Sequence, residues 1–183
     1  TAFWRFTLAL PLLALLMRGR GETIGRPSVM ALLAGTFFGL DITLWHASLV
    51  MTSVTNATFL VNLGNAAVGL VAWIALGERP GRWWLPAMAI ALAGAWLLST
   101  GASGAGGSAF TGDLLALGAA VMVGLYLFFA KLARRRQSAM SVLFWSTAAT
   151  LAVSAIAAGV RGESLLPADV SWLFWPLMLA VIA

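Results

Sequence analysis

Long runs of hydrophobic residues, separated by short polar segments, follow one another along almost the whole chain. We place seven runs, at residues 2–17, 29–51, 54–76, 83–100, 112–133, 141–160 and 170–183. A helix rises about 1.5 Å per residue, so roughly 20 apolar residues cross a hydrocarbon core of about 30 Å. The pattern therefore predicts an all-α polytopic membrane protein with about seven transmembrane helices in this chain.

The composition agrees with a chain that lies in a lipid bilayer. Hydrophobic residues make up 61% and charged residues 9% of the 183 residues, and the mean hydropathy is +0.95. Soluble domains contain closer to a quarter charged residues, because they need a polar surface. The chain has no cysteine and a single histidine, and it lacks the usual phosphate-loop and nucleophile motifs. We therefore expect neither enzyme activity nor a metal or other cofactor.

The basic residues predict the orientation of the helices. Nine of them lie in alternate connections, namely Arg18, Arg20, Arg26, Arg79, Arg82, Lys131, Arg134, Arg135 and Arg136, whereas the intervening connections contain only Arg161. Basic loops are retained in the cytoplasm during membrane insertion. We therefore expect a multi-pass protein of the cytoplasmic (inner) membrane, with the loops at 18–28, 77–82 and 131–140 in the cytoplasm. The net charge of +5 is then explained by the membrane without any nucleic acid partner.

An internal repeat runs through the chain. Phe3-Trp4 and Arg20-Gly21-Glu22 recur, at one constant offset, as Phe144-Trp145 and Arg161-Gly162-Glu163. Because the two arginine triplets are predicted on opposite sides of the membrane, the copies would run in opposite directions, as in many secondary transporters. The Gly/Ser-rich segment 101–111 is predicted to link the two halves, 1–100 and 112–183.

Several of these segments resemble the EamA-like family of the drug/metabolite transporter superfamily. The runs from Leu44 to Ser48 and from Thr52 to Thr58, closed by Gly77-Glu78-Arg79, resemble the family's third and fourth helices. Trp4-Arg5-Phe6 resembles part of its second helix, and the run from Gly112 to Tyr126 resembles its sixth. The resemblance implies a bundle of two inverted five-helix repeats, ten helices when complete. The chain would then be a piece of it, with helices 2–5 in residues 1–100 and helices 6–8 in residues 112–183.

The chain departs from the family at one point in the fourth helix. Family members usually have a proline after Asn-Leu, whereas this chain reads Asn62-Leu63-Gly64-Asn65. The resemblance therefore implies no proline kink here. We expect that Gly64 could still weaken the helix locally.

Arg5 and Asp41 are the main pair of ionisable residues inside the predicted spans. Counted from the cytoplasmic ends of their helices, both sit roughly 20 Å from the same membrane face at 1.5 Å per residue. Charged side chains in hydrocarbon usually pair or line a cavity. We predict an ion pair beside a substrate path; in the alternative, Arg5 extends to the outer interface and Asp41 bonds to a polar neighbour.

Polar residues form a stripe along the span at 54–76. The stripe consists of Thr55, Thr58, Asn62, Asn65 and Gly69, which share one helical face. These side chains can bind the polar groups of a substrate, or they can join helices in lipid; we favour a substrate cavity. Trp45 follows Asp41 by one turn and is predicted to stack on a substrate or to lie in the interfacial aromatic belt.

Three further residues are candidates for the cavity. His46 is a candidate proton carrier, although a structural hydrogen bond is the interpretation that we favour. Tyr126 and Trp145 are candidate polar or aromatic contacts, with core packing as the alternative.

The resemblance implies a secondary transporter that exports small metabolites, amino acids or drugs by alternating access. A non-transporting membrane scaffold or assembly subunit is the alternative, in which the polar stripes only join helices. A water-filled cavity on which the polar faces with Asp41 and Asn62 converge would distinguish a transporter from a scaffold. The expected partners are a small-molecule substrate and the lipid bilayer, while coupling to protons or to an exchanged solute, and a homodimer, stay open.

Overall fold

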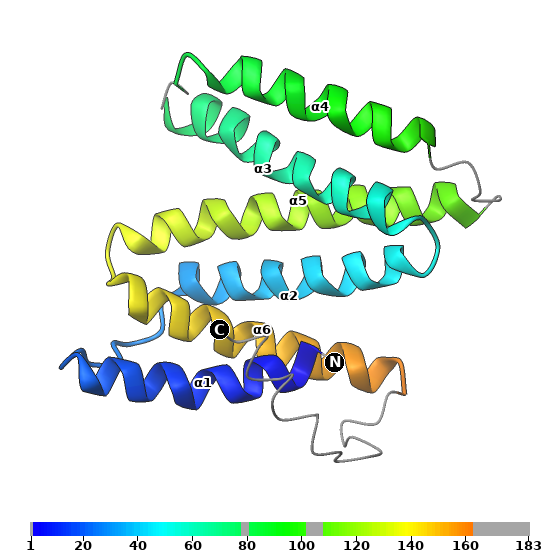
Figure 1. Cartoon of the computed structure of the whole chain (residues 1–183). Helices are drawn as coiled ribbons and strands as arrows, with labels where there is room; N and C mark the ends of the chain where they lie inside the picture. Colours follow the sequence, from blue (N-terminus) through cyan, green and yellow to red (C-terminus); the bar gives the residue numbers. More distant parts are fainter. Residues whose placement is uncertain (1, 78–80, 102–107, 163–183) are drawn as a thin grey trace. The chain divides into compact units, whose positions relative to one another are not determined.

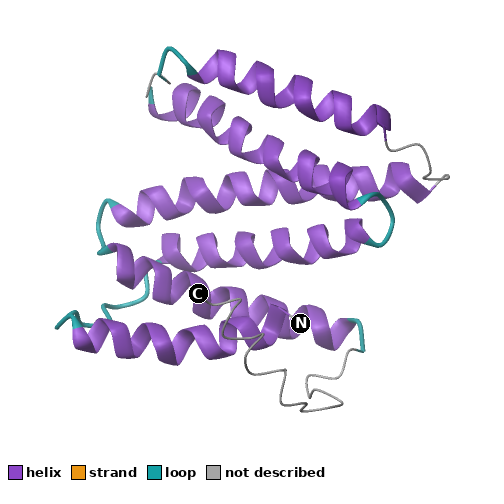
Figure 2. Ribbon diagram, in the orientation of Figure 1, coloured by secondary structure: helices purple, strands orange, loops and turns teal. Residues whose placement is uncertain are grey.

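All the regular secondary structure in the described part of the chain is helical. The computed structural model describes residues 2–77, 81–101 and 108–162, and Figures 1 and 2 show helices joined by short loops, without a strand in these ranges. The helices are α1 (Ala2–Gly19), α2 (Val29–Leu49), α3 (Val54–Leu76), α4 (Trp84–Gly101), α5 (Ser108–Arg134) and α6 (Ala139–Val160). The all-α prediction is confirmed for this part. The seventh predicted span, 170–183, lies outside the described residues.

Most helix ends lie within two residues of the predicted ones. The difference is largest at α5, which begins at Ser108 rather than at residue 112, and Gly101 is the last residue of α4. Residues 108–111 read Ser-Ala-Phe-Thr and contain no glycine or proline, so nothing in them breaks a helix. Both ends of the segment predicted as a linker are therefore helical, and residues 102–107 lie outside the described part.

Local hydrogen bonds explain where three of the helices begin. The hydroxyl of Ser53 accepts from the backbone N–H of Asn56 at the start of α3, at 3.1 Å. Ser138 accepts from Ser141 in the same way at the start of α6, at 3.2 Å. Ser28 accepts from the N–H of Ala31 at 3.1 Å. Serine at this position satisfies backbone donors that the first helical turn leaves unpaired.

The chain divides into two compact units, and the first is formed by residues 1–39 and 129–183. Its described part contains α1, the first half of α2, the end of α5 and α6, and Figure 1 shows α1 beside α6. Gly35 of α2 lies so close to α6 that an added β-carbon would meet the backbone of Ser146. The hydroxyl of Thr150 donates to the carbonyl of Gly35 at 2.9 Å. Glycine and small hydroxyl residues thus let these helices approach closely, as is common in membranes.

The second unit, residues 40–128, contains the second half of α2, α3, α4 and most of α5. The α3 helix continues through Gly64 without a break. A β-carbon at Gly64 would meet the carbonyl oxygen of Ala120 and lie 2.6 Å from the Val123 side chain. Gly64 therefore serves the close packing of α3 against α5, and it does not interrupt α3.

The ends of α1 and α6 have the same local geometry. Gly21 has a φ of 67° and Gly162 a φ of 65°, values in the left-handed region that glycine adopts without strain. The N–H of Gly21 donates to Arg18 at 3.0 Å, and the N–H of Gly162 donates to Gly159 at 3.1 Å. These four residues occupy equivalent positions in the two copies of the predicted repeat.

Candidate functional site

One face of α2 in the second unit carries two buried polar atoms without partners. Asp41 is 7% exposed, and neither its Oδ1 nor the indole Nε1 of Trp45 has a hydrogen-bond partner among the described residues. Ser48, one turn further, is fully buried and donates to the backbone carbonyl of Trp45 at 2.7 Å. Residues spaced by four and three positions lie on one side of a helix. The face therefore presents an acceptor and a donor one turn apart.

Unpaired polar atoms inside a membrane-spanning helix are costly. An unmet buried hydrogen-bonding group costs about 1–3 kcal/mol, and more when it is charged. Asp41 lies in the middle of α2, whose sequence is otherwise nearly all apolar. Ionisable residues in such positions are by default associated with function. The Asp41–Trp45 pair is therefore the strongest candidate for contact with a solute.

The predicted ion pair between Arg5 and Asp41 stays a prediction. Arg5 is exposed on α1, and it belongs to the first unit while Asp41 belongs to the second. Each residue lies in the helix that the sequence predicted for it.

A second polar cluster ties the turn between α2 and α3 to α5. Oδ1 of Asp113 accepts a hydrogen bond from the hydroxyl of Thr52 at 2.7 Å and another from the side-chain amide of Asn56 at 2.6 Å. The neighbouring Gly112 is buried, and a β-carbon there would lie 2.8 Å from the backbone nitrogen of Thr52. The close approach brings the carboxylate within reach of both donors. The cluster is a structural clamp between segments about 60 positions apart in the chain.

Asp113 and Asn56 were not among the site residues predicted from the sequence. A usable signal was present, because Asp113 is an ionisable residue inside the predicted span 112–133, and such residues are rarely without a partner. Asn56 lies beside the polar stripe rather than on it. No sequence pattern pairs it with a carboxylate so far along the chain.

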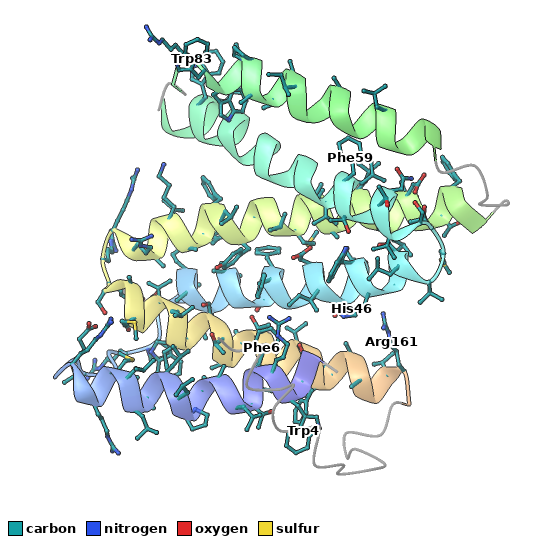
Figure 3. The ribbon with its side chains drawn as sticks, viewed as in Figure 1. Trp4, Phe6, His46, Phe59, Trp83 and Arg161 are labelled. Carbon is teal, nitrogen blue, oxygen red and sulfur yellow. The ribbon has the colours of Figure 1, made fainter. Side chains whose placement is uncertain are left out.

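His46 forms a hydrogen bond within its own helix. Its Nδ1 lies 2.8 Å from the carbonyl oxygen of Ile42, and because a carbonyl can only accept, Nδ1 carries the proton in this bond. The side chain is exposed on the second half of α2 (Figure 3). Its ring lies edge to face with that of Trp45, with 5.2 Å between the ring centroids. This arrangement agrees with the structural hydrogen bond favoured by the sequence, and proton transfer through His46 stays a prediction.

The other candidate residues are distributed over both units. Thr58 is exposed on α3 and Tyr126 is half-buried on α5, both in the second unit. The backbones of Asn62 and Asn65 belong to α3, but their side chains lie outside the described part. Trp145 is in the first unit, where its indole N–H donates to the carbonyl of Gly25 at 2.8 Å. The structure thus brings Asp41, Trp45 and His46 together on one helix, whereas a common cavity for the remaining candidates stays a prediction.

The described helices define the class of the protein. Three of them are long and apolar enough to cross a membrane, at Val29–Leu49, Phe110–Arg134 and Ala139–Val160. Large apolar side chains such as Ile90 and Val160 are 73% and 83% exposed, as expected for surfaces that face lipid. Among the residues that the structure describes, no group of three or more histidine and carboxylate side chains is arranged to hold a metal ion. The protein is a multi-pass α-helical membrane protein.

Comparison with known proteins identifies the family. The model of the EamA-like transporter family matches residues 1–100, which is more than half of the chain. The chain therefore belongs to the EamA-like transporter family, part of the drug/metabolite transporter superfamily, and the predicted resemblance is confirmed. No curated protein and no solved structure matches the chain.

Proposed function

We propose that this chain is part of a secondary transporter that exports small metabolites, amino acids or drugs across the cytoplasmic membrane by alternating access. Membership of a transporter family supports the class of activity. The observation that carries the proposal further is the pair of unmet buried atoms on α2, Oδ1 of Asp41 and Nε1 of Trp45. A transported solute would supply the missing partners.

The chemistry of these two atoms favours a polar solute. The carboxylate oxygen of Asp41 accepts hydrogen bonds, and the indole of Trp45 only donates. A small polar solute that carries both a hydrogen-bond donor and an acceptor, as amino acids and many metabolites do, would therefore suit these two atoms. The scaffold alternative is less favoured, because residues that only join helices would be expected to have their hydrogen bonds satisfied in the folded state.

The two matching helix ends support the proposed inverted repeat. The α1 and α6 helices lie beside each other in the first unit, and the side chain of Ser138, at the start of α6, donates to Glu22, just after α1, at 3.3 Å. The two helices therefore run antiparallel. Equivalent glycines end both of them with positive φ values. We accordingly propose two inverted repeats, 1–100 and 112–183, of a ten-helix transporter.

Contacts between loops support the proposed topology. In the first unit, the loops at 18–28 and 131–140 are joined by a hydrogen bond of 2.7 Å from Ser28 to Gln137. In the second unit, the bond from Thr52 to Asp113 joins the α2–α3 turn to the start of α5. Each pair would therefore lie on a single face of the membrane. The basic pair is then the cytoplasmic one.

Transport by the reconstituted protein tests the proposal. Proteoliposomes that contain the protein are screened for counterflow of radiolabelled amino acids and related metabolites, and Asp41→Asn is compared with the wild type. We expect Asp41→Asn to lower the rate at least tenfold, because the solute loses its charged partner. Glu22→Gln is the matched control, since it neutralises a carboxylate outside the helices, and its rate should stay within twofold. Equal rates for both variants would exclude Asp41 from the solute site, and a correctly folded protein that transports nothing in the screen would favour the scaffold.

A further inference from the structure

Two loops that are more than 100 positions apart in the chain are held together in the first unit. The side chain of Gln137 forms a bridge, because its amide N–H donates to the carbonyl of Arg26 at 2.7 Å while its Oε1 accepts from the hydroxyl of Ser28 at 2.7 Å. The indole of Trp145 holds the same loop through the carbonyl of Gly25 at 2.8 Å. We call the loops 18–28 and 131–140, joined in this way, the paired loops.

The paired loops concentrate positive charge. Their seven basic residues are all exposed, namely Arg18, Arg20, Arg26, Lys131, Arg134, Arg135 and Arg136. Glu22 is the single acidic residue in these two segments. Seven positive charges against one negative leave a net charge of +6. The contacts that hold the loops use amide, hydroxyl, indole and backbone groups, together with the carboxylate of Glu22, which accepts a hydrogen bond from the hydroxyl of Ser138 at 3.3 Å.

Holding like charges together is unfavourable unless anions are nearby. Two like unit charges 4 Å apart repel each other by about 1 kcal/mol in water, and the repulsion is stronger near a low-dielectric surface. An anion bound between the loops would offset this repulsion. Arginine is well suited to bind phosphate, because its planar guanidinium donates two parallel hydrogen bonds to the oxygens.

The position of the paired loops favours a lipid as the source of the phosphate. They connect directly to the ends of membrane-spanning helices, since α2 begins at Val29 and α6 at Ala139. Next to the basic residues are exposed apolar side chains, including Ile24 (43% exposed) and Val29 (68%). A phospholipid presents these two chemistries in the same order, with a phosphate at the surface and acyl chains below it. A soluble anion or a nucleic acid has no acyl chain that would contact the apolar side chains.

We propose that the paired loops form a binding site for the headgroup of an acidic phospholipid, with Arg26 on one loop and Arg134 and Arg136 on the other as the phosphate contacts. Gln137 is a positioning residue that keeps the two loops together. Basic pockets between transmembrane helices are known to bind acidic headgroups. The proposal does not depend on what the protein transports.

Lipid binding by the purified protein tests the site. Dioleoyl-phosphatidylglycerol or dioleoyl-phosphatidylcholine is titrated into the detergent-solubilised protein at 150 mM salt, with bound lipid counted by native mass spectrometry. Each basic contact near an acidic lipid contributes about fivefold in affinity. We therefore expect the triple variant Arg26→Gln/Arg134→Gln/Arg136→Gln to bind phosphatidylglycerol at least tenfold more weakly. The matched control, Arg82→Gln, removes an exposed arginine that lies over the ring of Trp83 at 5.4 Å, and it should change the affinity less than twofold.

Gln137→Ala separates a preformed site from the effect of charge alone. This change keeps all seven basic residues but removes the bridge, and we expect a loss of phosphatidylglycerol affinity of two- to fivefold. Trp145→Phe removes the other bond to the same loop and serves as an independent second variant, and the melting temperature of both variants is measured in phosphatidylcholine. The proposal is overturned if both variants bind phosphatidylglycerol like the wild type, or if Arg82→Gln lowers the affinity as much as the triple variant does. Displacement of the lipid by inorganic phosphate at equal concentration would also overturn it.

Discussion

The clamp at Asp113 makes a quantitative prediction about stability. Replacing Asp113 by alanine removes the shared acceptor of two hydrogen bonds, of 2.7 Å from Thr52 and 2.6 Å from Asn56. Hydrogen bonds to a charged group contribute about 1.5–3 kcal/mol each. All three side chains are only partly buried, so we take the lower end of that range for each bond. The expected loss is about 3 kcal/mol in the free energy of unfolding.

A thermal unfolding assay in detergent or nanodiscs measures this loss directly. For a chain of this size, 1 kcal/mol shifts the melting temperature by about 2–4 °C, so Asp113→Ala should lower it by about 6–12 °C. Asp113→Asn keeps an acceptor oxygen but loses the charge, and we expect about half that shift. The control is Thr55→Ala, which alters an exposed neighbour of Asn56 and should change the stability by less than about 0.5 kcal/mol.

A double-mutant cycle tests whether the hydrogen bond itself is responsible. The double variant Asn56→Ala/Asp113→Ala should lose about 1.5 kcal/mol less free energy of unfolding than the two single variants lose in sum, because each single change removes the same contact. A coupling energy below about 0.5 kcal/mol would refute the reasoning. In that case the clamp would owe its stability to the packing of Gly112 rather than to the carboxylate.

Three other predictions follow from single contacts. Gly35→Leu should lower the free energy of unfolding by about 3 kcal/mol, because its side chain would run into the backbone of Ser146. Gly94→Ala, in open space on α4, should be neutral or stabilising by up to about 1 kcal/mol, and equal effects of the two changes would contradict the close packing. Trp145→Phe should cost about 1 kcal/mol through the lost bond to the α1–α2 loop, and an unchanged melting temperature would show that this bond is not needed. His46→Gln should leave the pH profile of transport unchanged, since the imidazole bonds to its own helix, and a flattened profile would instead assign it a role in proton coupling.

The sequence alone was sufficient for the class of protein and for the course of its helices. The boundaries of α3 were predicted to the residue, because the apolar run ends where Ser53 and Gly77 provide helix caps. Family membership was also readable from the runs around Trp45 and Asn56, which lie in the matched residues 1–100. These features are local, since the length of an apolar run and the residues at its ends determine whether a helix can span a bilayer.

Only the tertiary structure decided which of the polar residues meet. Asp113 meets Asn56 where Gly112 allows α5 to approach the α2–α3 turn closely, and Gln137 meets Ser28 across two loops. The helical period of one segment does not contain that information. The same applies to Gly64, which looks in the sequence like a weak point in α3 and is in the structure a contact with α5. Hydrophobicity places a helix in the membrane, but it does not determine which of the other apolar helices packs against it. The choice of neighbour depends on the shape of the two surfaces and on the few hydrogen bonds between them.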